Sequence, residues 1–336
     1  MRISRKGAAG TLAALSIYAV LAQDAARLNA LIDSAVGTAA PSITVLLAKD
    51  DKTVYQHSAG SSFPDQRLII ASATKWISVA VLMTVVDSGK LSLDDRVAKF
   101  IPAFTGQKAR ITVRQLLSHT SGFPSDAPCL TSRSTTLERC AQEIAQLPLV
   151  GEPGTAFRYG GVSMQVAGRV AEIASGKSWN QLFSERIATP LGLTHTAYAG
   201  FGGVQNPGIG GGMISTASDY MVFLDMILRY GEYNGRRILS RSSIEEMERD
   251  QTAGAKIVFS PFAFYSPLEP SLADTRYGLG VWRERGGQEI SSPGAFGFSP
   301  WIDRSKNYAG VLAVQSRLAR VVPLYLKLKD ATRGSM

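Results

Sequence analysis

Segments that predict β-strands lie near both ends of this 336-residue chain, and segments that predict helices fill its middle. Residues 42–48 and 53–58 are rich in apolar and β-branched residues and flank a polar turn, which predicts a hairpin. Four more strands are predicted toward the C-terminus, at residues 277–283, 289–292, 297–303 and 307–315. We therefore expect an α+β fold in which one antiparallel sheet is assembled from both chain ends.

The helical signals define the rest of the predicted architecture. Apolar residues recur at helical spacing over residues 24–36 and 318–330, and these two helices should flank the sheet. Further helices are predicted at residues 72–87, 112–118, 135–147, 161–174, 178–188 and 220–230, with a capping box at Ser92–Asp95 opening another. We expect a sheet domain of residues 23–90 and 245–336, an inserted mainly helical domain of residues 91–244, and an active site in the cleft between them.

Residues 1–22 resemble a secretory signal peptide. Three basic residues precede an apolar run from Gly7 to Ala22, and the run ends in small residues before Gln23. The run is shorter than the roughly 20 residues of a membrane-spanning helix, although an uncleaved anchor is the alternative. We expect a secreted or periplasmic protein that has no stable membrane insertion after cleavage.

Charge and cysteine content narrow the classes of partner and cofactor. Three of the nine net positive charges lie in residues 1–22, which leaves +6 for the remainder, and its basic residues are scattered without interleaved aromatics. Nucleic-acid binding is therefore not expected. Cys129 and Cys140 are predicted to form a disulfide in an oxidising compartment, with two buried free thiols as the alternative. No histidine or cysteine has metal-ligand spacing, so we predict neither a metal nor a cofactor.

Ser72 and Lys75 form the chain's single Ser-x-x-Lys motif, at the start of the apolar helix. Positions i and i+3 share a helix face, so the amine could take the proton of the hydroxyl. The backbone N–H of Ser72, near a helix N-terminus, would suit an oxyanion, and burial would lower the pKa of Lys75 so that it could act as a base. The alternative is an ordinary polar helix start with a solvated lysine.

Four more motifs follow in a fixed order, and they are Leu116–Phe123 (LLSHTSGF), Phe157–Gly161 (FRYGG), Gly211–Asp219 (GGMISTASD) and Ser292–Gly297 (SPGAFG). With Ser72–Lys75 they resemble the serine hydrolases related to class C β-lactamases, a group that includes family VIII carboxylesterases, D-aminopeptidases and D-alanyl-D-alanine carboxypeptidases. The resemblance covers about residues 25–330. It implies the serine β-lactamase/DD-peptidase-like fold, with Ser72 as the acylated nucleophile and Lys75 as its proton partner.

The same resemblance assigns roles to residues downstream. Tyr159 matches the family tyrosine that shuttles protons, and a phenol needs a neighbouring cation to ionise near neutral pH, which Lys75 could supply. Gly294 and Ala295 match the strand edge of the third motif. Ala295 would contribute the second oxyanion N–H beside that of Ser72.

Two positions depart from the family pattern. Gly161 replaces an asparagine whose amide would contact both the lysine and an acylamide substrate. Ser292 replaces a lysine or histidine that would help to hold a substrate carboxylate. Both residues match substrate-binding positions, and their identities argue against β-lactam and peptide substrates more than against esters.

Other candidates receive less specific interpretations. His119 resembles a structural loop residue rather than a triad base, because the chain contains no Gly-x-Ser-x-Gly motif. The glycine-rich segment Gly208–Gly212 lacks the Gly-Lys-Ser/Thr of a phosphate loop and is predicted to pass close to a cleft. Four aromatic residues either line an acyl pocket or belong to the core, and these are Phe259, Phe262, Phe264 and Tyr265.

The sequence thus predicts an exported serine hydrolase, in the first place a carboxylesterase for short-chain esters. The first alternative is a weak β-lactamase, a D-amino-acid peptidase or a DD-carboxypeptidase, for which Arg317 or Arg320 would have to supply the missing cation. The second is a degenerate protein that binds cell-wall peptides without turnover. The expected partner is a small ester or amide, and the sequence leaves the oligomeric state open.

Overall fold

In the computed structural model the described residues are 24–336, apart from 51, 201, 253, 266 and 269, and they form an α+β fold. The predicted signal peptide, residues 1–22, therefore lies outside the described residues. A seven-stranded antiparallel sheet has the strand order β11-β12-β13-β14-β15-β1-β2. Its strands are β1 (Ile43–Lys49), β2 (Lys52–Ala59), β11 (Arg276–Tyr277), β12 (Trp282–Glu284), β13 (Glu289–Ser291), β14 (Ser299–Asp303) and β15 (Tyr308–Val314).

The sheet joins the two ends of the chain, as the sequence predicts. β1 pairs with β2 on one side and with β15 on the other, so the N-terminal hairpin extends a sheet whose other strands are all C-terminal. Neighbouring side chains of β1 point to opposite faces, with Val45 in the core under the terminal helices and Leu46 in the core on the other face. Both faces of the sheet are therefore covered.

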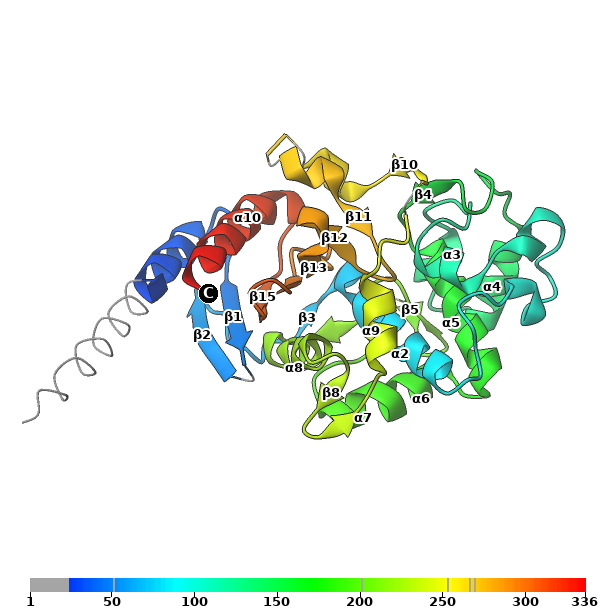
Figure 1. The fold of residues 1–336 in the computed structure, drawn as a ribbon, viewed down its shortest axis with the longest axis horizontal. Coiled ribbons are helices and arrows are strands. Elements are labelled where there is room, and N and C mark those ends of the chain that lie inside the picture. Colours follow the sequence, from blue (N-terminus) through cyan, green and yellow to red (C-terminus); the bar gives the residue numbers. More distant parts are fainter. Residues whose placement is uncertain (1–23, 51, 201, 253, 266, 269) are drawn as a thin grey trace, which may run out of the picture.

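The two terminal helices cover one face of the sheet. The helix at residues 24–35 and α10 (Leu318–Ser335) lie side by side, at the left of Figure 1. Leu28 and Ile32 pack with Leu324 and Leu328 against the apolar side chains of β1 and β15. Across the sheet, α8 (Ala217–Leu228) packs through Phe223 into the larger core cluster.

The remaining helices form the mainly helical part of the molecule, at the right of Figure 1. They are α2 (Thr74–Asp87), α3 (Val113–Leu117), α4 (Leu137–Gln146), α5 (Val162–Ser175), α6 (Trp179–Phe183), α7 (Thr189–Leu191) and α9 (Arg241–Glu248). Short strand pairs connect them, namely β3 (Leu68–Ile69) with β7 (Ile214–Ser215), β4 (Ala156–Arg158) with β10 (Lys256–Phe259), β5 (Gly202–Gly203) with β6 (Asn206–Pro207), and β8 (Glu232–Tyr233) with β9 (Arg236–Arg237). The domain limits at residues 90 and 245 stay predictions.

Two local predictions are wrong. Ser92–Asp95 opens no α-helix. The Ser92 N–H does donate to the Asp95 carboxylate, but the backbone becomes extended at Arg96, which bridges to Thr112, and only a 3-10 turn, Val97–Lys99, follows. The predicted strand at 277–283 is two short strands, β11 and β12. Gly280 separates them with a φ of 75°, and a Cβ there would lie 2.8 Å from the Lys75 carbonyl oxygen, so this backbone bends to pack against α2.

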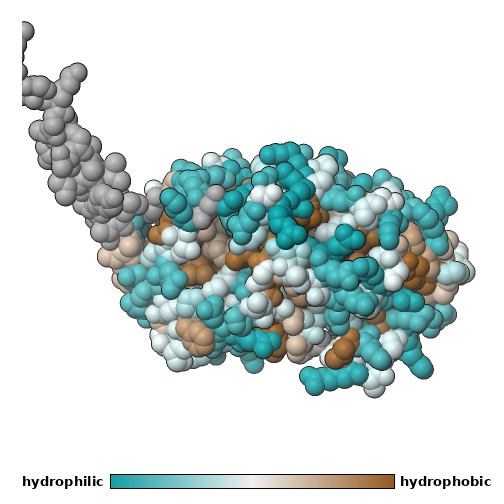
Figure 2. Space-filling view, turned by 90° about the horizontal axis from the view of Figure 1, so that it is seen from below, coloured by the Kyte–Doolittle hydropathy of each residue, from teal (hydrophilic) through white to brown (hydrophobic). Residues whose placement is uncertain are grey.

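The surface is of mixed polarity. Figure 2 shows one face of the molecule, on which hydrophobic residues are interspersed among hydrophilic ones. Among the described residues, no helix is both long enough and apolar enough to cross a membrane.

Candidate active site

Ser72 lies in a 3-10 turn, Ala71–Ala73, that leads directly into α2. The turn is strained, because Ala71 has a φ of 45°, in the left-handed region that residues with a side chain rarely adopt. Such strain persists where the surrounding structure holds it, and it is common at functional sites. The following helix is buried on all sides through Val85, so it gives Ser72 a rigid base.

The Lys75 amine donates hydrogen bonds to the Ser72 Oγ at 3.1 Å and to the Gly210 carbonyl oxygen at 2.6 Å. Only 3% of Lys75 is exposed, and burial lowers its pKa from 10.5 to about 7. At neutral pH a large fraction of the amine is therefore uncharged. An uncharged amine in contact with a hydroxyl can accept its proton.

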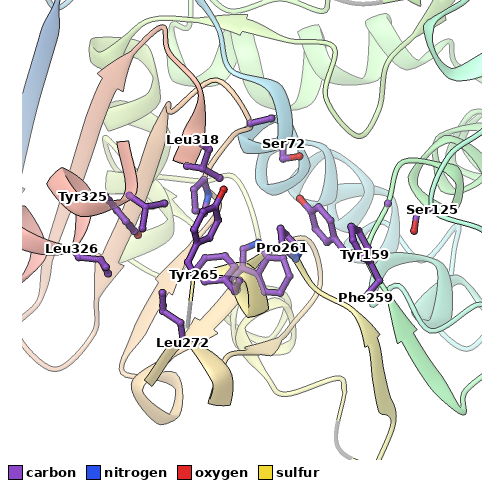
Figure 3. Close-up of a pocket in the computed structure, with 16 residues that line it drawn as sticks. Ser72, Ser125, Tyr159, Phe259, Pro261, Tyr265, Leu272, Leu318, Tyr325 and Leu326 are labelled. Carbon is purple, nitrogen blue, oxygen red and sulfur yellow. The ribbon is translucent and has the colours of Figure 1, made fainter. Parts of the chain in front are cut away.

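Tyr159 follows β4 and brings its ring over the Lys75 amine, with the Nζ 4.6 Å from the ring centre. Its hydroxyl points toward Ser72 in Figure 3. Burial raises the pKa of Tyr159, and hydrogen bonds with Ser72 and Trp282 offset this rise only in part. The tyrosinate expected from the sequence is thus not favoured, because burial keeps Tyr159 a neutral phenol, and the amine beside it is about half uncharged at neutral pH.

His119 lies behind Tyr159 and not beside Ser72. Its ring centre is 4.8 Å from that of Tyr159 and 5.0 Å from that of Tyr277, and both ring nitrogens are without a hydrogen-bond partner among the described residues. Burial, followed by the charge of Lys75, holds the pKa of His119 well below its usual value. The backbone carbonyl of His119 accepts from Arg158 N–H at 2.9 Å, so this loop supports the strand that carries Tyr159.

The third motif approaches Ser72 through backbone contacts. The Ser292 hydroxyl donates to the Ser72 carbonyl oxygen at 3.2 Å. A Cβ at Gly294 would lie 2.1 Å from the Ile70 carbonyl oxygen, so only glycine allows this approach. The N–H groups of Ser72 and Ala295 have no hydrogen-bond partner among the described residues, and both residues line one pocket. Two such N–H donors facing one pocket are what an oxyanion hole requires. Their role as an oxyanion hole stays a prediction.

Two pockets meet at Ser72. The apolar pocket, of about 270 Å³, lies between α10 and the segment after β10 (Figure 3), and its lining contains no charged side chain among the described residues. Besides Ser72, it is lined by Ser125, Tyr159, Gly160, Phe259, Pro261, Phe262, Tyr265, Leu272, Trp282, Pro293, Ala295, Leu318, Val322, Tyr325 and Leu326. Three of the four predicted aromatic residues thus line a pocket, and the side chain of Phe264 lies outside the described ones.

The polar pocket, also of about 270 Å³, lies on the helical side of Ser72. Besides Ser72 and Lys75 it is lined by Ser125, Asp126, Leu130, Thr131, Tyr159, Gly160, Gly161, Gln165, Gly208, Gly210, Gly211 and Gly212. The glycine-rich segment therefore passes along a cleft, as predicted, and its Gly210 carbonyl contacts the lysine. Sequence reasoning missed Ser125, Asp126, Leu130 and Gln165, which carry no motif of their own and reach the site only through folding.

No second cation enters either pocket. Lys75 is the sole positively charged side chain among the described residues that line them. Arg317 and Arg320, considered above as replacements for the missing cation, are exposed, and Arg320 lines a separate groove beside the N-terminal helix. Over the described chain, no cluster of three or more histidine, cysteine or acidic side chains is placed to hold a metal ion.

The predicted disulfide between Cys129 and Cys140 is formed, and it borders the polar pocket. It links the 3-10 turn Pro128–Thr131 to α4. The buried Asn206 amide donates to the carbonyl oxygens of Cys129 and Ser132, at 2.8 and 2.9 Å. These bonds hold the turn that places Leu130 and Thr131 in the pocket wall.

The comparisons with known proteins agree with the observed fold. A model of the Beta-lactamase family matches residues 28–321. A solved candidate beta-lactamase from Bacteroides dorei DSM 17855 is 37% identical, with a TM-score of 0.78, and the match covers 86% of this chain and 90% of that one. EstCE1, described as a hydrolase with promiscuous acyltransferase activity, shares the fold at 21% identity, with a TM-score of 0.77 and coverage of 94% and 99%.

Matches to curated relatives are shorter. Penicillin-binding protein 4 of Amycolatopsis lactamdurans is 35% identical over 127 residues, which is 36% of this chain and 33% of that protein. The chain thus matches about a third of the length of the curated relatives.

Proposed function

The chain belongs to the Beta-lactamase family, a fold family of serine hydrolases, and from that premise we propose that it is an exported carboxylesterase that forms an acyl-enzyme on Ser72. The observation that carries the proposal is the apolar pocket, which opens directly onto Ser72 and has no charged side chain in its described lining. An alkyl or aryl group of an ester gains free energy on entering such a pocket, whereas a carboxylate would lose its hydration there.

The proposed reaction uses the groups that surround Ser72. Uncharged Lys75 takes the hydroxyl proton while the Ser72 Oγ attacks the ester carbonyl carbon, and the N–H groups of Ser72 and Ala295 stabilise the resulting oxyanion. The alcohol leaves with the proton that Lys75 received. A water molecule, held by the neutral Tyr159 hydroxyl, then attacks the acyl carbonyl carbon and gives a proton to uncharged Lys75. As the bond from that carbon to the Ser72 Oγ breaks, Lys75 passes the proton to the Oγ, and the carboxylic acid leaves.

The position of Ser292 favours esters over β-lactams and peptides. The family cation at this place would hold a substrate carboxylate, but the Ser292 hydroxyl is instead directed at the carbonyl oxygens of Ser72 and Gly280. Neither Arg317 nor Arg320 lines the described pockets, so neither arginine replaces that cation. A neutral ester does not need it.

One observation favours a second candidate, a hydrolase of amides that carry a free amine. Asp126 is exposed at the polar pocket and forms no ion pair with any described residue, and its Oδ1 accepts from Ala127 N–H. A carboxylate so placed would attract an ammonium group. If this candidate holds, a D-amino-acid p-nitroanilide is hydrolysed, and Asp126→Asn raises its KM several-fold but leaves the N-acetylated analogue unchanged.

Two features support export. Residues 1–22 have the order of charges and apolar residues of a signal peptide, and the disulfide is typical of oxidising compartments. Immunoblots of periplasm, medium and cytosol after expression of the full chain test this. Retention of the unprocessed chain in the cytosol would contradict it.

The proposed activity is tested with p-nitrophenyl butyrate and the chain from Gln23. Ser72→Ala should abolish hydrolysis, whereas Ser242→Ala, which changes an exposed serine of α9 that lines neither pocket, should retain most of it. Equal activity in wild type and Ser72→Ala would refute the acyl-enzyme. A folded wild type that is inactive toward esters and amides would instead favour a protein that only binds peptides.

A further inference from the structure

We propose that Leu130 is a specificity-determining residue that occupies the place of a side chain at position 161 and thereby selects plain alkyl acyl groups over acylamido groups. This inference rests on the proposed esterase function and names the class of acyl group within it. It concerns the polar pocket, whose wall contains both Leu130 and Gly161.

The glycine at 161 is explained by its neighbour and not by its backbone. Gly161 precedes α5 with φ −97° and ψ −28°, a conformation that any residue adopts. A Cβ built there would lie 2.8 Å from Leu130 Cδ1. The leucine methyl group therefore takes up the space into which a side chain at 161 would extend.

The backbone that carries Leu130 is held in place. Its backbone N–H donates to the Ala127 carbonyl at 3.1 Å, and the neighbouring Cys129 is fixed by the disulfide to Cys140. The Asn206 amide, which holds the carbonyl of Cys129, is itself bound by the Gln165 side chain at 2.7 Å. The disulfide and these hydrogen bonds thus fix the turn from which the Leu130 side chain extends toward position 161.

Lys75 does not depend on an amide at position 161. The Gly210 carbonyl accepts from its amine at 2.6 Å, and a Cβ at Gly210 would lie 3.4 Å from both the Lys75 Nζ and the Gly161 Cα. The glycine loop therefore supplies the contact that a side-chain amide would otherwise make with the lysine. Replacing the amide by Leu130 and Gly161 changes what the substrate meets and leaves the base in place.

The contact between Leu130 and position 161 should disfavour acyl groups that carry an amide and leave alkyl acyl groups unaffected. An acyl group with an amide near its carbonyl must exchange hydrogen bonds with water for bonds with the protein, and the methyl groups of Leu130 provide none. One unmade hydrogen bond costs roughly 1 kcal/mol, and about 1.4 kcal/mol corresponds to a tenfold change in kcat/KM. A pentanoyl chain of equal length contains no amide, so it loses no hydrogen bond in the same position.

The experiment compares two p-nitrophenyl esters with equal chain length and the same leaving group, the pentanoate and the N-acetylglycinate. The wild type should prefer the pentanoate. The double variant Leu130→Ala/Gly161→Asn should raise the ratio of kcat/KM for N-acetylglycinate over pentanoate by about fivefold. The matched control Leu130→Ala/Gly161→Ala makes the same space without an amide and should leave the ratio near that of Leu130→Ala alone.

Melting temperatures of the same variants test the packing without turnover. Gly161→Ala should lower the melting temperature in the wild-type background and have a smaller effect when Leu130 is alanine. Equal effects in both backgrounds, or an unchanged substrate ratio in the Asn double variant, would overturn the proposal. If the wild type hydrolyses neither ester, the proposed function fails, and the melting temperatures still decide whether Leu130 occupies the site.

Discussion

The two pockets at Ser72 are of similar volume, but they come from different parts of the chain and differ in chemistry. The apolar pocket is built mainly from Phe259 onward, by the segment after β10, the third motif and α10. The polar pocket is built from the helical middle, by the turns around Asp126 and Leu130 and by the glycine loop. Ser72 and Tyr159 are common to both. The proposed reacting groups are thus shared, and under the proposed function the two sides of the substrate would be selected by separate structural units.

Lys75→Met tests the shared machinery and should have the largest effect. Methionine fills the volume of the buried aliphatic part of the lysine side chain but removes the base. Loss of a positioned base lowers the reaction rate by about 10²- to 10⁴-fold. Because the lysine serves substrates in either pocket, kcat/KM should fall by the same factor for p-nitrophenyl acetate and octanoate. A fall for one ester only would show that Lys75 acts on substrate binding instead. Circular dichroism checks the fold.

Tyr159→Phe should slow turnover of both esters by about 10²-fold, since it removes the hydroxyl that holds the water and keeps the ring that packs on Lys75. Tyr277→Phe is the matched control, because it removes the hydroxyl of a tyrosine whose ring packs against His119. This variant should be nearly as active as the wild type. Near-normal turnover of Tyr159→Phe would refute its catalytic role.

The pH dependence sharpens the assignment of the base. The pKa of Lys75 is about 7 and the active form is the uncharged amine, so kcat/KM should rise with pH up to about 7 and level off above it. Well below pH 7, kcat/KM should fall about tenfold for each pH unit, because a single proton on the Lys75 amine inactivates the enzyme. An ionised tyrosine as the base would instead make the rate rise far above pH 8, since burial raises the pKa of Tyr159. Initial rates between pH 5 and 10 separate the two.

Leu326→Trp should have the smallest effect on kcat/KM, and this effect should depend the most on the substrate. Leu326 lines only the apolar pocket, so the larger ring should lower kcat/KM for an ester of a long alcohol, octyl acetate, several-fold and change that for ethyl acetate little. Thr131→Val, a change confined to the polar pocket, serves as the control and should leave the octyl-to-ethyl ratio unchanged. If the two variants affect the ratio equally, the two pockets do not divide the substrate in this way.

Local sequence patterns predicted much of the architecture. The N-terminal hairpin, the buried helix α2 and the helix start at Thr112 follow from side-chain periodicity and capping, which act over a few residues. The predicted disulfide was also correct. The errors arose where distant backbone intervened, as at Gly280, which bends the chain because α2 lies against it.

The site was predictable to the extent that it is local. Ser72 and Lys75 are three residues apart on one rigid element, so their contact is set by helix geometry and can be recognised in the sequence. The neighbouring motifs placed Tyr159 and Ala295 near Ser72 by resemblance. Asp126, Leu130 and the carbonyl of Gly210 carry no such pattern, because their position in the site depends on where whole segments pack.

The sequence by itself therefore determined the contact between Ser72 and Lys75, the family and the disulfide, since each depends on residue types at short or recurring spacings. Only the tertiary structure decided the charge states and the pocket walls. Burial depends on everything that surrounds a group, and it lowers the pKa of Lys75 while raising that of Tyr159. The apolar pocket, likewise, joins side chains as far apart in sequence as Ser72 and Leu326.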